Sequence, residues 1–165
     1  MHTMKTTTSL FLLLAFTFAG FAADRTRESQ TNDIREAVFR YQFDHIAPGK
    51  QESVKLYVLG VGESCSDPSD EFLKRFANHQ PPVKKASASS YVPNEGLVDK
   101  ETHRIALMFW ANNIAWISDT DVEVSGAYHS AMLSASSDYY TVKNENGKWK
   151  VTEVNNKWTR RVLTN

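Results

Sequence analysis

The stretch DYYTVKNENGKWKV, residues 138–151, decides the fold because it predicts a β-hairpin whose register can be read from the letters. Asn146 and Gly147 both tolerate a positive φ, which makes Asn-Gly the strongest short signal for a two-residue hairpin turn. A turn of this length pairs Val142 with Val151 on the two strands. The sequence therefore predicts an antiparallel pair that closes at residues 146 and 147.

This register gives the hairpin two unlike faces, because side chains alternate along each strand. One face is apolar and the other is polar, so we expect one side to face the core and the other to face water. The register also sets Glu145 opposite Lys148. The apolar face consists of Tyr140, Val142, Trp149 and Val151, and the polar face consists of Thr141, Lys143, Lys150 and Thr152.

Two further β-forming segments precede the hairpin. Residues 104–118 are apolar at consecutive positions, so this strand is expected to be covered on both faces. A helix is the expected cover of one face, and a second copy of the chain or a terminal segment that folds back is the expected cover of the other. The first face carries Ile105, Leu107 and Phe109, and the second carries Ala106, Met108 and Trp110. Residues 119–128 alternate, with Val122, Val124, Gly126 and Tyr128 on one face.

Two helices are predicted upstream. Residues 33–46 form the longer one, with Asp33 as the N-cap and Glu36 as its capping-box partner. Its apolar stripe consists of Ile34, Val38, Tyr41 and His45, widened by Ala37, Phe39, Phe43 and Ile46. Residues 67–80 predict a short helix that is capped by Asp67, has Pro68 at its first position and ends before Pro81 and Pro82.

The rest of the chain is expected to complete a sheet. Residues 53–62 are β-branched and apolar, residues 83–89 form a weak edge strand, and residues 90–103 form a loop or a short hairpin. The predicted fold class is therefore α+β. We expect an N-terminal helix packed in a curved antiparallel sheet of four to six strands, with a second short helix.

The first 23 residues resemble a secretory signal peptide. Lys5 precedes an apolar run from Leu10 to Ala23, and small residues at its end suit cleavage after Ala22 or Ala23. The run is too short and too interrupted to span a bilayer. We expect residues 1–23 to be removed and residues 24–165 to form one exported domain, periplasmic or extracellular, that is not held in a membrane.

Charge and cysteine content exclude several classes of function. Without residues 1–23, 18 basic and 19 acidic side chains remain, a formal charge of −1. This balance argues against nucleic acid as a partner, because phosphate neutralisation supplies most of that affinity. Cys65 is the single cysteine, so an internal disulfide is excluded.

Three segments carry a resemblance to a known fold: DPSDEFLKRFANHQPPVKK, WISDTDVEVSGAYHS and SASSDYYTVKNENGKWKV. They resemble small exported bacterial proteins of uncharacterised function. The order of elements is similar to that of the cystatin-like superfamily, and most of all to its nuclear-transport-factor-2-like domains. The resemblance implies a sheet curled around the first helix, with a cone-shaped cavity that some members use for isomerisation or dehydration and many use only for binding.

An isomerase of this kind needs a carboxylate base in an apolar cavity and a hydroxyl that donates to an oxyanion. Asp44, His45 and Tyr128 form the first trio to test, and Asp138 is a second candidate acid. The aromatic residues are more often core than pocket, although some are expected to border a cavity. The candidate pocket residues are Tyr41, Asp44, His45, Trp110, Trp116 and Tyr128.

Other chemistry has no support in the sequence. His45, His79, His103 and His129 lack the spacing that brings two imidazoles onto one metal ion, and His79 and His103 are expected at the surface. No G-x-S-x-G elbow and no glycine-rich phosphate loop occurs, so neither a metal nor a cofactor is predicted. The leading hypothesis is a non-enzymatic accessory module that binds a small apolar ligand or a protein partner, which could be a second copy of the chain bound through the sheet face. The alternative is an isomerase or dehydratase.

Overall fold

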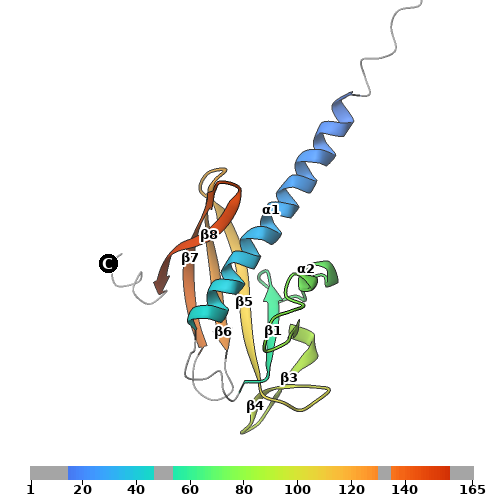
Figure 1. Ribbon diagram of the computed structural model, residues 1–165, viewed down its shortest axis with the longest axis vertical. Helices are drawn as coiled ribbons and strands as arrows, with labels where there is room; N and C mark the ends of the chain where they lie inside the picture. The colour runs from blue at the N-terminus through green and yellow to red at the C-terminus, as the bar shows by residue number, and fades with distance from the viewer. Residues whose placement is uncertain (1–14, 47–53, 130–134, 157–165) are drawn as a thin grey trace, which may run out of the picture. The chain divides into compact units, whose positions relative to one another are not determined.

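The computed structural model describes residues 15–46, 54–129 and 135–156 (Figure 1). Residues 32–165 form the compact unit that carries the sheet. Helix α1 spans Ala15–His45, and its part from Asn32 onward belongs to this unit. A second helix, α2, spans Asp70–Lys74.

The described strands form one large sheet and one small one. The large sheet has six strands in the order β2-β1-β5-β6-β7-β8, and β3 and β4 pair separately. The bounds in the large sheet are β1 Leu56–Val61, β2 Val83–Lys85, β5 Ala106–Trp116, β6 Asp121–His129, β7 Ala135–Glu145 and β8 Lys148–Asn156. A 3₁₀ turn, η1 (Ala86–Ala88), leads into the small pair, β3 (Ser89–Val92) and β4 (Gly96–Asp99).

The predicted α+β class is confirmed, since one main helix, a second small helix and a mostly antiparallel six-stranded sheet are present. The antiparallel prediction is wrong at one edge. Strand β1 runs parallel to both β2 and β5, with Tyr57 opposite Val83 on one side and Leu107 on the other. The chain reaches β2 from β1 through α2, and a crossover of this kind is what a parallel pair requires.

The predicted hairpin is confirmed. Val142 lies opposite Val151, Glu145 lies opposite Lys148, and the turn residues Asn146 and Gly147 have φ angles of 54° and 80°. The side chains of Tyr140 and Val142 are fully buried and Trp149 is 8% exposed, as the predicted apolar face requires.

A β-bulge in β8 adjusts this facing. Val142 pairs with Val151 while Thr141 pairs with Glu153, so Thr152 is the extra residue between them. Strict alternation after Val151 would have placed Glu153 on the core face. The bulge instead lets both Val151 and Val154 pack against the core, and it leaves Glu153 exposed.

The start of the first helix differs from the prediction. Asp33 is not an N-cap, because α1 continues upstream to Ala15. Its carboxylate instead accepts a hydrogen bond from Nη1 of Arg75 at 2.6 Å. The predicted signal peptide, residues 1–23, falls largely outside the described residues, and its cleavage stays a prediction.

The sheet-facing stripe of α1 is also rotated from the predicted one. Tyr41 is half-buried and His45 is exposed, although both were expected on the stripe. At 100° per residue, Gln42 lies between Val38 and Phe39 around the helix. A polar residue therefore occupies the middle of the packed face. The most deeply buried residues of α1 are Ile34, Val38, Phe39, Gln42 and Phe43.

Helix α2 begins two residues later than predicted, at Asp70 and not at Pro68, and Ser69 caps it. The Ser69 hydroxyl oxygen accepts from the backbone N–H of Phe72 at 3.1 Å. Asp67 was the predicted cap; its carboxylate instead accepts from the backbone N–H of Ser87 at 2.9 Å and from the Ser87 hydroxyl at 2.6 Å. Asp70 and Glu71 occupy the first turn as predicted.

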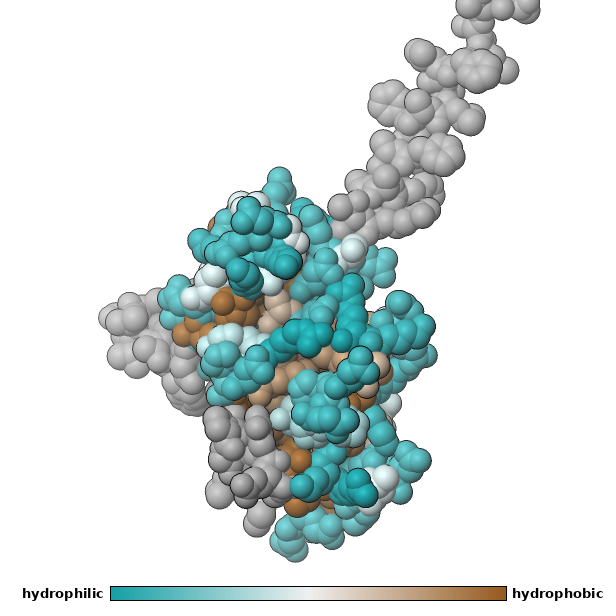
Figure 2. All heavy atoms as spheres, viewed as in Figure 1, coloured by the Kyte–Doolittle hydropathy of each residue, from teal (hydrophilic) through white to brown (hydrophobic). Residues whose placement is uncertain are grey.

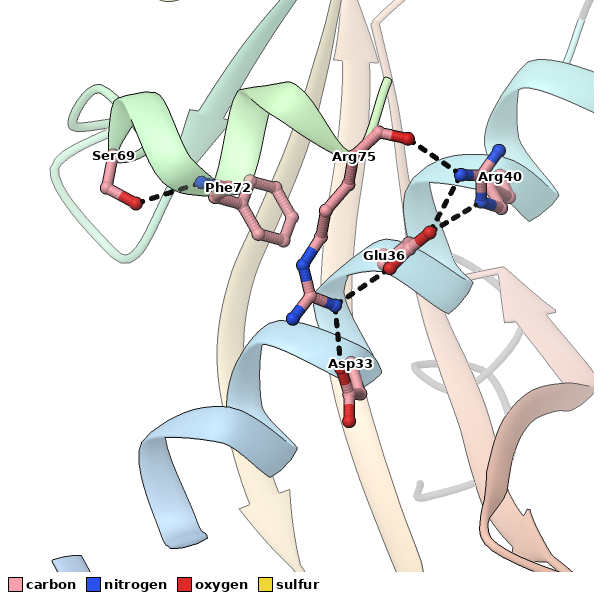
Figure 3. Close-up of polar contacts among 6 residues, drawn as sticks. All are labelled: Asp33, Glu36, Arg40, Ser69, Phe72 and Arg75. Carbon is pink, nitrogen blue, oxygen red and sulfur yellow. Dashed lines mark hydrogen bonds and ion pairs between the residues drawn. The ribbon is translucent and has the colours of Figure 1, made fainter. Parts of the chain in front are cut away.

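An ion-pair network joins α2 to α1 (Figure 3). Arg75, at the C-cap of α2, reaches Asp33 at 2.6 Å and Glu36 at 2.8 Å. Arg40 reaches Glu36 at 2.7 Å and donates to the Arg75 carbonyl at 3.0 Å. Below this network, the rings of Phe72 and Phe76 lie 6.1 and 6.3 Å from the ring of Phe39.

The second face of β5 is covered within the chain. Leu97 of β4 joins a small buried cluster with Leu56, Val58 and Ala106, and Met108 packs against it. The β3–β4 hairpin therefore supplies a cover that was expected from a second copy or a terminal segment. The hairpin covers the beginning of β5 at Ala106. Further along β5, Met108 and Trp110 are half-buried.

Candidate functional site

Gln42 is the polar centre of the contact between α1 and the sheet. Its side chain is fully buried, and Nε2 lies 3.2 Å from the Tyr140 hydroxyl oxygen. Nε2 also lies 3.4 Å from the carbonyl oxygens of Trp110 and Ala127. Because carbonyl oxygens only accept, the amide must turn its NH₂ group toward them, and this fixes the position of Oε1. Oε1 is buried and has no partner among the described residues.

Gly126 makes room for this arrangement. A Cβ atom at Gly126 would lie 2.8 Å from the Tyr140 ring, 2.9 Å from the Trp110 carbonyl oxygen and 3.1 Å from Gln42 Nε2. The neighbouring strand β5 is irregular here, with a register shift between Ala111 and Ile114. A glycine inside a strand commonly marks such a close approach.

The hydroxyl of Tyr140 is the second polar group of the site. Burial raises its pKa well above the ordinary tyrosine value of 10.0, the hydrogen bond from Gln42 lowers it in part, and the charge of Asp138 raises it further. The hydroxyl therefore keeps its proton and can donate. Its oxygen accepts from Gln42, and no described residue accepts its hydrogen.

The two groups offer complementary chemistry. Gln42 Oε1 is an unused acceptor, and the Tyr140 hydroxyl is an unused donor next to it. Leaving a buried polar group unpaired costs about 1 to 3 kcal/mol. A hydroxyl, a carboxyl or an amide group of a bound molecule can accept from Tyr140 and donate to Gln42 at the same time, and so can a water molecule.

Two of the predicted pocket residues lie at this site. The ring of Tyr41 meets the ring of Tyr140 edge-on, with 5.9 Å between centroids. Tyr41 and Tyr128 both act electrostatically on the hydroxyl of Tyr140. Both side chains are half-buried, so they extend from the polar centre toward the surface.

The two predicted tryptophans have other surroundings. The indole N–H of Trp110 donates to the Gly62 carbonyl at 2.8 Å, and only its backbone carbonyl reaches Gln42. Trp116 packs edge-on against Trp149 at 5.7 Å. Both side chains are half-buried.

The structure does not bring the predicted catalytic trio together in a buried cavity. Asp44 and His45 are both exposed. The ring of His45 stacks on Tyr41 at 4.0 Å, and its Nδ1 lies 2.9 Å from the Tyr41 carbonyl oxygen. Tyr128 is therefore the one member of the trio linked to Tyr140.

Among the described acids, Asp99 is the deeply buried one, at 3% exposure. Its carboxylate receives Lys84 Nζ at 3.1 Å and the Thr102 hydroxyl at 2.6 Å. Burial raises the pKa of Asp99, but the hydrogen bonds from Thr102 and Lys84 outweigh it and hold the pKa below its ordinary value. This carboxylate is paired as an anion in β4, which suits a structural role.

Neither a metal site nor a reactive thiol emerges from the described residues. They contain no group of three or more His, Cys, Asp or Glu side chains that could hold an ion. Burial raises the pKa of Cys65, which makes its thiol a poor nucleophile. His79 is not at the surface as expected; it is half-buried, and its ring lies 4.6 Å from that of Phe43. His103 is exposed as predicted.

Sequence reasoning missed Gln42, because a search for an apolar stripe passes over a polar residue. The missed signal is its spacing, since Gln42 follows Ile34 by eight residues and Val38 by four, which places it on the same face. The glycine at position 126 was placed correctly on the inward face of its strand. Its role as a space for Gln42 and Tyr140 could not be read from the letters.

The site has an uncovered side. Helix α2 lies beside α1 near β1, and no described helix lies on the other side of α1, over β7 and β8 (Figure 1). Figure 2 shows apolar atoms at the surface next to α1 in this view. The half-buried apolar residues that pack against the core include Tyr41, Tyr128, Val151 and Val154.

The chain matches no protein-family model, no curated protein and no solved structure. The residues at the contact between α1 and the sheet must therefore carry the functional argument. None of the described helices has the length and hydrophobicity needed to cross a membrane.

Proposed function

We propose that this protein is a non-enzymatic binding module for a small, mainly apolar molecule that carries one hydroxyl, carboxyl or amide group. The observation that supports the proposal is the unpaired acceptor of Gln42 beside the unpaired donor of Tyr140. The half-buried rings of Tyr41 and Tyr128 extend this centre toward the uncovered side of α1 and offer apolar contact to the rest of the ligand.

We also propose that the sheet is curved around α1 as in nuclear-transport-factor-2-like domains, and that the protein is exported. Irregularities between Ala111 and Ile114 and at Thr152 bend strands next to α1, which supports a sheet curved in the manner of nuclear-transport-factor-2-like domains. The signal-peptide pattern of residues 1–23 supports export. N-terminal sequencing of the purified chain tests cleavage after Ala22 or Ala23.

The isomerase alternative has less support. A catalytic carboxylate base requires apolar surroundings that raise its pKa. Asp44 is exposed, and Asp99 is paired with Lys84. Among the described residues, the carboxyls with a displaced pKa are Asp67, Asp70, Glu71, Asp99 and Asp121, and all five shift downward. Asp138 acts on Tyr140 and is the residue to replace if turnover is found.

Titration with octanol, a neutral probe with one hydroxyl, tests the proposal. The full-length sequence is expressed, and binding to the purified chain is followed by tryptophan fluorescence and calorimetry. We expect saturable binding that weakens about three- to tenfold in Gln42→Met and Tyr140→Phe, the effect of losing one neutral hydrogen bond. Tyr139→Phe, on the opposite face of β7, is the matched control and should bind as the wild type does.

Two results would contradict the proposal: no saturable binding of octanol, or binding that is equal in wild type and Gln42→Met.

A homodimer through the sheet face is a separate proposal. The half-buried Met108 and Trp110 support it, and the cover that Leu97 gives to Ala106 reduces the area it could use. Sedimentation of the same samples measures the oligomeric state.

A further inference from the structure

A second polar residue lies on the packed face of α1. Around the helix, Arg35 falls between the positions of Gln42 and Phe39, both fully buried. Its own side chain is half-buried, and its Nε atom is buried without a partner among the described residues. Two of the three unpartnered buried side-chain atoms of the described residues, Arg35 Nε and Gln42 Oε1, therefore belong to one stripe.

The neighbouring arginines do have acid partners, so the lack of a partner is specific to Arg35. Arg40 and Arg75 both pair with Glu36, and Arg75 also pairs with Asp33. These two acids are the nearest along α1 on either side of Arg35, and both are engaged on the α2 side. Within the described residues, the Arg35 guanidinium has no acid partner.

An unpaired charge in this position is costly. Burial lowers the pKa of Arg35 from its ordinary value, the direction expected when desolvation acts without a compensating anion. Arginine is not deprotonated in proteins, so the guanidinium retains its charge. A planar guanidinium matches a carboxylate by paired, charge-assisted hydrogen bonds, and such a partner would offset the cost.

We infer that the ligand of the proposed site is an elongated carboxylate, whose charged end binds Arg35 and whose second polar group binds Gln42 and Tyr140. This inference rests on the proposed function. Arg35 and Gln42 are seven residues apart, about 10 Å along the axis at 1.5 Å per residue. A ligand that satisfies both is an amphipathic hydroxy acid with an apolar chain of about that length, because a hydroxyl can both donate to Gln42 and accept from Tyr140.

The test compares two probes of similar length, octanol and ω-hydroxyoctanoate, on the full-length protein. Wild type should bind the hydroxy acid at least about tenfold more tightly than octanol, as a charge-assisted bond predicts. Arg35→Gln should remove that preference, and Arg35→Lys should keep part of it. Arg104→Gln, which removes the same charge at an exposed position, is the matched control.

The outcomes separate this inference from the proposed function. If octanol binds through Gln42 but the hydroxy acid binds no more tightly, or Arg35→Gln keeps the preference, the inference is wrong and the binding module stands. If neither probe binds, both are wrong. Circular dichroism of each variant establishes that it is folded, and octanol binding by Arg104→Gln is an internal measure of an intact site.

Discussion

Helix α1 makes two contacts that differ in how their polar groups are treated. Its contact with α2 buries aromatic rings, and the charged groups above them are paired, as Arg75 is with Asp33 and Glu36. Its contact with β5, β6 and β7 buries Gln42 Oε1 and the donor of the Tyr140 hydroxyl, and neither has a partner among the described residues. Within this part of the chain, the first contact pairs its charged groups and the second leaves these two groups unpaired.

This difference indicates that the contact between α1 and α2 is structural, and that the contact between α1 and the sheet holds the candidate site. Partly exposed ion pairs contribute about 0 to 1 kcal/mol each, so the rings of Phe39, Phe72 and Phe76 dominate the first contact. That contact therefore gives no reason to expect a second molecule there. In the second contact, the unpaired polar groups of Gln42 and Tyr140 reduce stability. Apolar side chains would pack on this face without that cost. Polar groups that reduce stability are commonly retained where function requires them.

The largest expected effect is at the complete contact. Phe39→Ala should lower the free energy of unfolding by about 3 to 5 kcal/mol, because it removes a fully buried ring and leaves a cavity. Urea denaturation measures this change. Tyr91→Ala, at a position that is 63% exposed, is the control and should change stability by less than about 0.5 kcal/mol. Equal effects of the two substitutions would contradict the assignment of the core.

Gly126→Ala should have the next largest effect. The added methyl group meets the Trp110 carbonyl and the Tyr140 ring at distances that require the strands to shift, and overpacking of this kind costs about 1 to 3 kcal/mol. Ala127→Ser adds an atom on the opposite face of β6 and serves as the control. A Gly126→Ala variant with wild-type stability and wild-type octanol binding would show that the close approach is not needed.

A smaller effect is expected from Tyr140 at alkaline pH. Its pKa is raised in the folded state above the ordinary value of 10.0, so the folded state holds the proton more tightly than the unfolded state. That stabilisation is present in full below pH 10 and is lost as the pH rises through the folded pKa. The unfolding free energy of wild type should therefore fall above pH 10 more steeply than that of Tyr140→Phe.

The same pH series needs a control for the other tyrosines, because burial also raises the pKa of Tyr57. Tyr139→Phe should retain the wild-type slope above pH 10, since it leaves both buried hydroxyls in place. If Tyr140→Phe has the wild-type slope as well, the hydroxyl of Tyr140 is not desolvated in the way the site requires.

The smallest effect on stability is expected at Gln42. Its hydrogen bonds are long, at 3.2 to 3.4 Å, and Gln42→Met removes an unpaired buried oxygen together with them. The two terms oppose each other, so the unfolding free energy should change by less than about 1 kcal/mol. Gln42→Ala, which also opens a cavity, should cost more. A large loss in Gln42→Met would make Gln42 a structural residue.

Local patterns predicted the elements whose cause is local. The register of β7 and β8 follows from the turn at Asn146 and Gly147, and the inward face of β6 follows from its alternation. The parallel pairing of β1 could not be predicted, because it depends on which edge the chain returns to after α2. The cap of α2 was misplaced because Asp67 and Ser69 are both good caps, and the tertiary partner Ser87 engages Asp67.

The candidate pocket residues stay a prediction. Tyr41 and Tyr128 were named among them, and both act electrostatically on the hydroxyl of Tyr140. Gln42 and Arg35 were missed because they are polar residues on a face defined by its apolar neighbours. Their importance comes from burial without a partner, which depends on the whole sheet and not on local spacing.

The most direct test of this account is a crystal structure of the full chain purified without removal of bound molecules. The electron density between Gln42 Oε1 and the Tyr140 hydroxyl shows whether a ligand binds there. We expect an organic molecule that donates to Gln42 Oε1 and accepts from the Tyr140 hydroxyl. A single water in that place, or a hydrogen bond donated directly by the Tyr140 hydroxyl to Gln42 Oε1, would contradict it.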